Sequence, residues 1–415
     1  MYCQKDVNTF VNLLQRCIQR DLAKGKELQL LIVINGLENI PYLAACVIRM
    51  FSSFDLLSEA QRVFKKLSEP DVFAWSAIIA AHAGLGENEE ALALYYEMCD
   101  SSVEADGHVF VAALKVCSSL GRLDEGRVIH CSIIESGLES DVYVGSTIIS
   151  MYSNCRCVLD ALVVFERLPE RNIVTWSALI SGYAKQGKGE EALKCFQYMQ
   201  HHGISPDIVT FLCILKACIS LSDVDKGKEI HAEIVKEGLL TTDILVVNAL
   251  IDMYAKCGAF EKAEAIFDEL PIRTVVSWTS LISGYAQQGQ GHEALKCVKR
   301  MQSEGLSPDA VTFICSLKAC SCLGEISSGQ KIHAEIAMEG YEIDLCIGNT
   351  LIDMYGSCGL LIEAQDVFDE MPVRNIISWN ILIAGYAEHG DAKGTTKCLK
   401  EMELEGVSPN ATTRI

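Results

Sequence analysis

The stretch "IVTWSALISGYAKQGKGEEALKCFQYMQHHGISPD" runs from Ile173 to Asp207, and "VVSWTSLISGYAQQGQGHEALKCVKRMQSEGLSPD" repeats most of it from Val275 to Asp309. Apolar residues recur at i, i+3, i+4 and i+7 on both sides of a QGKG break: Trp176, Leu179, Ile180 and Tyr183 before it, and Ala192, Cys195, Phe196 and Met199 after it. Gly203 suits the left-handed residue that ends a helix, and Pro206 prevents its continuation. The stretch therefore predicts a helical hairpin.

The hairpin phrase recurs through the chain with a period of about a hundred residues: Trp75, Trp176, Trp278 and Trp379 mark its copies, 101, 102 and 101 residues apart. Each period holds three kinds of segment. First-type segments cover 72–106, 173–207, 275–309 and 376–410. Second-type segments, with "LKVC" or "LKAC", cover 107–141, 208–243 and 310–344. Third-type segments, with "MYSNC", "MYAKC" or "MYGSC", cover 142–172, 244–274 and 345–375. A divergent second-type segment (7–40) and a divergent third-type segment (41–71) precede them, and 411–415 starts another segment.

Two helices of about a dozen residues cannot bury both of their apolar stripes alone, so neighbouring hairpins are expected to stack and share one continuous core. We therefore predict an all-α fold, a right-handed superhelical α-solenoid of helix-turn-helix repeats. Residues 1–415 are expected to form a single array of about eleven repeats.

Bulk composition limits the class of protein. Lys and Arg total 35 against 55 Asp and Glu, a net charge of −20, which argues against a general polyanion binder. The apolar stretch Leu28–Ile34 is far shorter than a membrane span, so we expect a soluble protein. The first twenty residues show no targeting signal, and the nineteen cysteines include no Cys-x-x-Cys, which favours a reducing compartment.

The segment lengths of 35, 35 or 36, and 31 residues, together with the wording quoted above, resemble the plant pentatricopeptide repeat family, its PLS subclass in particular. The resemblance covers nearly the whole chain. It implies sequence-specific binding of single-stranded RNA, with one base for each first-type or third-type segment. It also implies a chloroplast or mitochondrial location and a role as specificity factor for RNA editing or processing, with catalysis supplied elsewhere.

In that family the fifth and last residues of a repeat recognise the base. The resemblance assigns this role in first-type segments to Ser76 with Asp106, Ser177 with Asp207, Thr279 with Asp309, and Asn380 with Asn410. In third-type segments it assigns the role to Ser146 with Asn172, Asn248 with Thr274, and Asn349 with Asn375. A carboxylate that only accepts hydrogen bonds suits guanine, whereas an amide suits the donor and acceptor of adenine.

By the family's code, these pairs predict the target 5′-G-x-A-G-x-C-G-x-Y-Y-3′ for residues 72–410. The fifth residues of second-type segments, Val111, Leu212 and Ile314, cannot hydrogen-bond a base edge, so their bases stay unassigned. The pair of Ala45 with Asp71 is also left open.

Two further positions follow from the resemblance. The second residue of each repeat is expected to flank the base: Val174 and Val276 with Phe73, Tyr143, Leu245, Cys346 and Ile377. The thirteenth residue often faces a phosphate, a role for Lys185 and Lys256, but other segments have Gln287, Asn154, Ser357 or Glu388 there. We therefore expect modest affinity and a shallow salt dependence, on the order of two or three neutralised phosphates.

Other chemistry has weak support in the sequence. Cys195, Cys297 and Cys398 share a helical register with Leu94, and Cys155, Cys257 and Cys358 share another with Phe54, so we interpret both sets as packing positions. The His-x-Glu at His231 and at His333 lacks the Pro-Cys-x-x-Cys of a zinc deaminase. We expect no enzyme activity, no cofactor or metal, and neither of the family's E and DYW extensions.

Two alternatives stay open. Polar fifth residues can simply be solvated side chains near a helix start. The acidic composition would also suit a protein-binding scaffold of tetratricopeptide type. If the family assignment holds, small organellar editing-factor proteins are expected as partners of the second-type segments near Val111, Leu212 and Ile314, and no membrane contact is expected.

Overall fold

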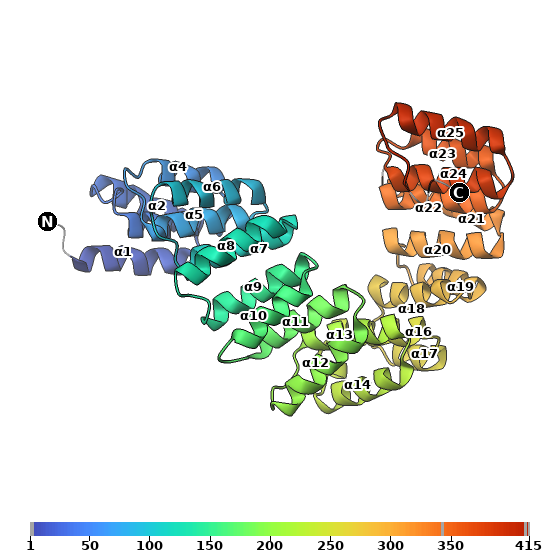
Figure 1. The fold of residues 1–415 in the computed structure, drawn as a ribbon, viewed down its shortest axis with the longest axis horizontal. Coiled ribbons are helices and arrows are strands. Elements are labelled where there is room, and N and C mark those ends of the chain that lie inside the picture. The colour runs from blue at the N-terminus through green and yellow to red at the C-terminus, as the bar shows by residue number, and fades with distance from the viewer. Residues whose placement is uncertain (1–3, 342–343, 411–412, 414–415) are drawn as a thin grey trace. The chain divides into compact units, whose positions relative to one another are not determined.

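The computed structural model describes residues 4–341, 344–410 and 413, and regular structure in these residues is entirely α-helical (Figure 1). The chain divides into two compact units, Met1–Ala217 and Cys218–Ile415, and the boundary lies inside one helix, α13. Each unit is a series of antiparallel helix pairs, so the predicted all-α fold of stacked helix-turn-helix repeats is confirmed.

The first helices of the pairs are α1 (Gln4–Cys17), α3 (Pro41–Ser52), α5 (Val72–Gly84), α7 (Gly107–Leu120), α9 (Val142–Asn154), α11 (Ile173–Lys185), α13 (Ile208–Leu221), α16 (Ile244–Lys256), α18 (Val275–Gln287), α20 (Ala310–Leu323), α22 (Leu345–Ser357) and α24 (Ile376–Glu388). From α3 onward, each begins at the first residue of a segment defined above. The helix α1 begins three residues before Val7, where the sequence places the first segment.

The second helices are α2 (Leu22–Ile34), α4 (Leu57–Lys65), α6 (Asn88–Asp100), α8 (Leu123–Glu135), α10 (Val158–Arg167), α12 (Gly189–His201), α14 (Val224–Lys236), α17 (Phe260–Asp268), α19 (Gly291–Ser303), α21 (Ile326–Met338), α23 (Leu361–Glu370) and α25 (Ala392–Leu404). The second-type segment 208–243 has one more residue than its copies. It also has a short extra helix, α15 (Leu239–Thr242), which the sequence pattern did not predict.

Helix starts are fixed by the residue that ends the preceding segment. Asp141 Oδ1, for example, accepts a hydrogen bond of 2.8 Å from the backbone N–H of Val144 at the start of α9. Such N-caps are typically worth about 1 kcal/mol each. At the other end of a hairpin, Gly203 has a φ of 71° just after α12, as its position in the sequence predicted.

Within each unit, first helices stack on the first helices of neighbouring pairs, and second helices pack on the first helix of their own pair and of the next pair. The four tryptophans, Trp75, Trp176, Trp278 and Trp379, are all buried in this layer arrangement. Trp278 lies edge-on to Phe267, with ring centroids 4.5 Å apart, and Trp176 packs in the same way on Phe165. These tryptophans are therefore core residues, as their register predicted.

Close approach of first helices depends on a glycine of the "SGY" phrase. A Cβ at Gly182 would lie 2.4 Å from Ser153 Oγ on α9, and a Cβ at Gly284 would lie 2.2 Å from the Cβ of Ala255 on α16. Neither position has room for a side chain, because the contacts are too short for carbon atoms. The glycine therefore sets the spacing between a third-type segment and the first-type segment that follows it.

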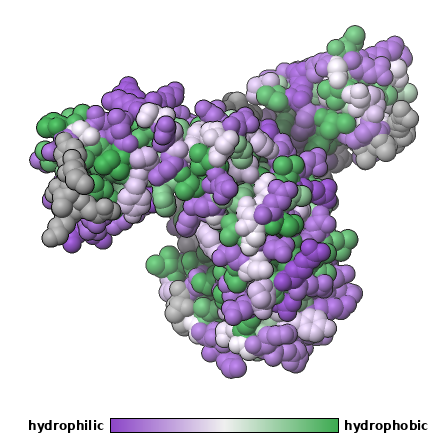
Figure 2. Space-filling view, turned by 60° about the vertical axis from the view of Figure 1, so that its left-hand side comes forward, coloured by the Kyte–Doolittle hydropathy of each residue, from purple (hydrophilic) through white to green (hydrophobic). Residues whose placement is uncertain are grey.

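The cysteines of the described residues are free thiols. Burial raises the pKa of Cys195, Cys297 and Cys398 to about 11, so these thiols stay protonated at neutral pH. Their predicted packing role is confirmed. Apolar side chains also reach the surface, where they form separate green patches among hydrophilic residues (Figure 2). Among the described residues, no helix is both long and apolar enough to cross a membrane.

Candidate nucleic-acid interface

The predicted fifth residues lie in the second turn of each first helix, and most of them are covered by neighbouring first helices. Ser76, Ser146, Ser177, Asn248, Thr279 and Asn349 are only 5% to 9% exposed, whereas Asn380 is half-buried. The alternative of solvated polar side chains near a helix start is therefore wrong for these six, because stacking of first helices removes most of their contact with water.

Ser177 and Asp207 meet in a hydrogen-bonded set with a third side chain, Thr210. Asp207 Oδ1 accepts from the Thr210 backbone N–H at 2.8 Å, from Thr210 Oγ1 at 2.6 Å and from Ser177 Oγ at 3.3 Å. Ser177 Oγ lies 2.7 Å from Thr210 Oγ1 and also 2.7 Å from the carbonyl oxygen of Ile173. The last residue of the segment is thus at once the N-cap of α13 and a partner of the fifth residue.

The copy in the second unit has the same arrangement. Thr279 Oγ1 lies 2.8 Å from Thr312 Oγ1, which donates to Asp309 Oδ1 at 2.7 Å. In the first-type segment 376–410, Asn380 Nδ2 donates to Asn410 Oδ1 at 3.4 Å, and Thr413 Oγ1 donates to Asn380 Oδ1 at 2.6 Å. Three of the four first-type pairs are therefore joined directly or through one hydroxyl.

The remaining pairs are not joined by a hydrogen bond among the residues that the structure describes. Ser146 Oγ donates to the carbonyl oxygen of Tyr143 in its own helix. Asn172, Thr274 and Asn375 form capping boxes with Thr175, Ser277 and Ser378 at the next helix start. The Oδ1 atoms of Asn248 and Asn349 are buried and have no hydrogen-bond partner in the described part of the chain, which typically costs about 1–3 kcal/mol each.

A cavity of about 270 Å³ opens beside the pair in 173–207. It brings together four predicted site residues, Val174, Ser177, Lys185 and Asp207, and adds Val209, the second residue of the next segment. A cavity of about 470 Å³ lies beside Ser76 and is also lined by His108, Val111, Lys115 and Tyr143. In the second unit, a cavity of about 430 Å³ lies beside Asn380 and Ile377.

The second residues of the segments lie on the surface, and Val174, Tyr143 and Ile377 line the three cavities just described. Val174, Val276, Tyr143, Leu245 and Ile377 are each 53% to 57% exposed, Phe73 is 44% exposed, and Cys346 is also exposed. Single exposed apolar side chains are common on protein surfaces, but here they recur at one position of successive segments. Their exposure agrees with the predicted position beside a base.

The two predicted phosphate-facing lysines already have partners. Lys185 Nζ donates to Asn154 Oδ1, the thirteenth residue of the preceding segment, and Lys256 Nζ lies 2.8 Å from Asp252 Oδ1. Acidic groups gather nearer the end of the chain, where burial and the neighbouring Glu388 raise the pKa of Asp353. Asp353 and Glu388 both line the cavity beside Asn380. Of the three cavities, this one is therefore the least favourable for a polyanion.

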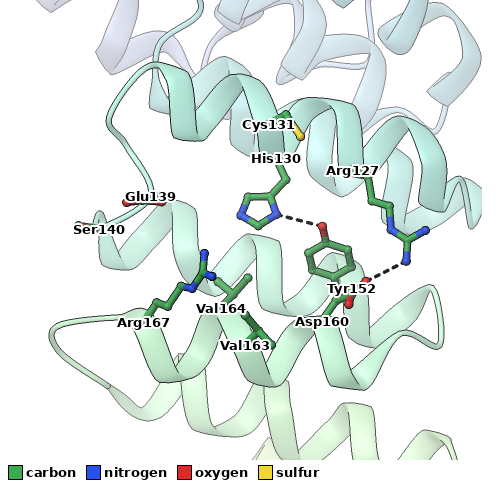
Figure 3. Close-up of a pocket in the computed structure, with 10 residues that line it drawn as sticks. All are labelled: Arg127, His130, Cys131, Glu139, Ser140, Tyr152, Asp160, Val163, Val164 and Arg167. Carbon is green, nitrogen blue, oxygen red and sulfur yellow. Dashed lines mark hydrogen bonds and ion pairs between the residues drawn. The ribbon is translucent and has the colours of Figure 1, made fainter.

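Another cavity, of about 320 Å³, lies between the second helices of a second-type and a third-type segment (Figure 3). His130 Nδ1 lies 2.9 Å from the Tyr152 hydroxyl, and Arg127 forms an ion pair of 2.9 Å with Asp160. The same His–Tyr contact recurs at His231 with Tyr254, 3.1 Å, and at His333 with Tyr355, 2.9 Å.

These histidines therefore pack against tyrosines at successive segment junctions, and burial lowers the pKa of His130 and His231. Within the described part of the chain, no group of His, Cys, Asp and Glu is arranged to hold a metal ion. The histidines of the His-x-Glu sequences at His231 and His333 thus have a structural role in packing on tyrosines.

The residue that sequence reasoning missed is the third of the following segment, Thr210 or Thr312. A signal was available in the sequence, since "PDIVTF" and "PDAVTF" both place a threonine three residues after the aspartate. That spacing is typical of a side chain that contacts an N-cap. The equivalent phrase after Asp106 is "GHVF", which has Val109 instead.

Two family models match this chain. The one described as the PPR repeat family matches residues 171–220, 273–322 and 374–414, and the one described as the PPR repeat matches residues 73–103, 146–173, 246–273 and 349–376. Together they cover more than half of the chain, and the matches follow the first-type and third-type segments.

Full-length relatives agree with the family models. A mitochondrial pentatricopeptide repeat-containing protein of Arabidopsis thaliana is 35% identical over 88% of this chain and 36% of its own length. A chloroplastic pentatricopeptide repeat-containing protein of the same plant is 33% identical over 96% of this chain and 64% of its own length. The chain thus spans between about a third and two thirds of these relatives.

Among solved structures, the pentatricopeptide repeat protein PPR10 in complex with an 18-nucleotide psaJ RNA element has a TM-score of 0.67 and 19% identity, over 98% of this chain and 64% of PPR10. A crystal structure of PPR10 from maize, whose description mentions no RNA, has a TM-score of 0.60. At this identity the likeness concerns the fold. With the repeat matches and the helical pairs taken together, the chain belongs to the pentatricopeptide repeat family.

Proposed function

We propose that this chain binds single-stranded RNA in a sequence-specific way, with one base beside each first-type and third-type segment. The observation that carries the proposal is the cavity beside Ser177 and Asp207, where two polar side chains meet between the exposed apolar residues Val174 and Val209. Apolar walls suit the faces of a base, and polar groups between them suit its edge. The similar fold of PPR10, which was solved with an RNA element, supports the same use of the array.

The chemistry of this set favours guanine. The Thr210 hydroxyl donates to Asp207 Oδ1, so the Ser177 hydroxyl proton is directed to Thr210 Oγ1, to the Ile173 carbonyl or, at the longer distance of 3.3 Å, to Asp207 Oδ1. Lone pairs of Ser177 Oγ and the second oxygen of Asp207 then remain as acceptors. Guanine presents neighbouring N–H donors on its Watson–Crick edge, whereas adenine presents a donor and an acceptor there. The assignment of G to this segment and to 275–309 therefore has a physical basis.

The wider role that we propose is that of a specificity factor for RNA editing or processing in a chloroplast or mitochondrion, with catalysis by another protein. The names of the two relatives, one mitochondrial and one chloroplastic, support an organellar location. The segment lengths favour the PLS subclass. If editing-factor proteins bind second-type segments, Leu212 and Ile314 are the half-buried fifth residues available to them, whereas Val111 is buried.

Selection of bound RNAs from a random pool tests the proposal. The wild-type chain is expected to enrich 5′-G-x-A-G-x-C-G-x-Y-Y-3′ or a part of it. The substitution Thr279→Asn, with Asp309 retained, should shift one position from G toward U. Asn248 shows that a first helix of this chain accommodates asparagine at the fifth position. An unchanged preference would refute the assigned register, and enrichment of no RNA by the wild-type chain would leave the protein-binding scaffold as the better explanation.

A further inference from the structure

Charge is distributed unevenly between the two layers of helices. The whole chain has a net charge of −20. The first helices from α3 to α24 nevertheless carry six cationic residues, Arg49, Lys115, Lys185, Lys216, Lys256 and Lys318. Their acidic residues are only Asp252, Asp353 and Glu388. Within their helical bounds the first helices therefore carry more cations than acids. The aspartates that cap seven of them lie just before those bounds: Asp71, Asp106, Asp141, Asp207, Asp243, Asp309 and Asp344.

Half of these cations occupy one position of one kind of segment. Lys115, Lys216 and Lys318 are each the ninth residue of a second-type segment, in the phrases "LKVC" and "LKAC". The ninth residue of the first-type segments is small and uncharged: Ala80, Ser181, Ser283 and Ala384. Residues two, five and nine of a first helix recur at i, i+3 and i+7, so the lysine lies on the same helix face as the base-flanking and fifth residues.

The three lysines are exposed, and none of them forms a salt bridge with any acid of the described residues. Among the described residues, five other lysines do pair with an acid, for example Lys226 with Glu229 and Lys228 with Asp225 on α14. The three ammonium groups are therefore free of ion pairs within the described part of the chain and accessible to an anion. The ninth residue of the third-type segments is not cationic: it is Ser150, Asp252 or Asp353.

Their surroundings place them beside the candidate cavities. Lys115 lines the cavity of Ser76 together with Arg49 and Tyr143. Burial raises the pKa of the Cys213 thiol, and both Lys216 and Lys185 act against the rise, so the two ammonium groups lie around one side chain. Burial also raises the pKa of the Cys315 thiol, and Lys318 and Lys256 both act against that rise. Each ninth-position lysine thus adds to the charge next to a first-type or third-type segment.

We propose that the second-type segments bind the RNA backbone, with Lys115, Lys216 and Lys318 each contacting a phosphate. The inference rests on the proposed RNA binding and gives a role to segments whose apolar fifth residues recognise no base. A lysine is a compact charge on a flexible stem, which suits a phosphate that carries no sequence information. Phosphate contacts then exceed the two or three expected from Lys185 and Lys256 alone.

The test uses the salt dependence of binding to one RNA taken from the pool selection. For single strands, each neutralised phosphate contributes about 0.7 to the slope of log affinity against log salt. The triple variant Lys115→Gln, Lys216→Gln and Lys318→Gln is expected to lower that slope by about 2 and to leave the selected consensus unchanged. Replacing the same three lysines by arginine should restore the wild-type slope, because the charge is kept.

A matched control removes three lysines from second helices: Lys194→Gln, Lys228→Gln and Lys296→Gln. Both triple variants change the net charge equally, so a general electrostatic effect would lower both slopes alike and would overturn the inference. An unchanged slope in the first triple variant would also overturn it, while the proposed function would stand if the wild-type consensus is kept. Failure of the wild-type chain to bind any RNA would refute both the phosphate contacts and the proposed RNA binding.

Discussion

The first-type segments 72–106 and 173–207 have the same fifth and last residues, serine and aspartate, but different hydrogen bonding between them. In 173–207, Thr210 connects Ser177 to Asp207. In 72–106 the corresponding residue is Val109, whose backbone N–H is the one group of the described residues that donates to Asp106 Oδ1, at 2.9 Å. Ser76 Oγ forms no hydrogen bond with any other described residue. The two sites therefore have the same fifth and last residues and differ in one hydroxyl group of the following segment.

This difference shows that the fifth and last residues do not fix the chemistry of a site by themselves. The hydroxyl proton of Ser177 has acceptors within the protein, at 2.7 Å in Ile173 and Thr210 and at 3.3 Å in Asp207, so the oxygen faces a ligand mainly as an acceptor. The hydroxyl of Ser76 can rotate and either donate or accept. We therefore expect the site at Ser177 to prefer guanine over adenine more strongly than the site at Ser76.

The largest effect is expected from the aspartate that both sites share. Asp207→Asn should change the preferred base at its RNA position from G to A. The ratio of the affinities for G and A should fall by about tenfold or more, because a hydrogen bond to a charged group contributes about 1.5–3 kcal/mol. Asparagine is as good an N-cap as aspartate, so thermal unfolding should stay close to that of the wild type. Binding to RNAs that differ at this one base measures the exchange.

Asp106→Asn is the companion variant. Its change in the preference for G over A should be smaller, because Ser76 can already donate to adenine. Equal exchanges at the two sites would contradict the role given to Thr210. A large loss of stability in either variant would show that the carboxylate does more than cap the helix and contact the base.

A smaller effect is expected from Thr210→Val, which makes the second site resemble the first. The buried hydroxyl contributes hydrogen bonds to Asp207 and Ser177, each worth about 0.5–1.5 kcal/mol net. The preference for G over A should fall about threefold to tenfold at this position. Thr210→Ser retains the hydroxyl and should retain the preference, which separates its loss from a change in packing. If the valine variant keeps the wild-type preference for G, Thr210 does not explain the difference between the two sites.

Much of the fold could be predicted because hairpin repeats are governed by local pattern. The i, i+3, i+4 spacing, the glycine after a helix and the repeated tryptophans all act within a few residues of one another, and a period of about a hundred residues repeats each signal several times. The register of helix starts follows from capping residues such as Asp141, which are also local.

The details of the site were less predictable, because they depend on contacts between consecutive segments. The burial of Ser177 arises from the stacking of first helices, which no single segment specifies. The unpaired Oδ1 of Asn248 is likewise a property of the packed array. Lys216 was visible in "LKAC", but its proximity to Lys185 of the preceding first helix is likewise a property of the packed array.

The most sensitive way to sharpen the comparison is to give the first site the missing hydroxyl. In Val109→Thr the new group is buried, but Asp106 Oδ1 already accepts from the backbone N–H of that residue, as Asp207 does from Thr210. The hydroxyl therefore has an acceptor in place, and the free energy of unfolding should change by no more than about 1 kcal/mol. The preference for G over A at this position should rise about twofold to threefold, measured with paired RNAs that differ at one base.

Val144→Thr is the matched control for that variant. Val144 is buried in the same way behind the N-cap Asp141, but the fifth residue of that segment is Val111, which has no hydroxyl to orient. The control should leave base preference unchanged at every position. If both substitutions raise the preference for G, the gain comes from general stiffening of helix starts. If only Val109→Thr does, the third residue of the following segment sets how strictly a serine–aspartate pair selects its base.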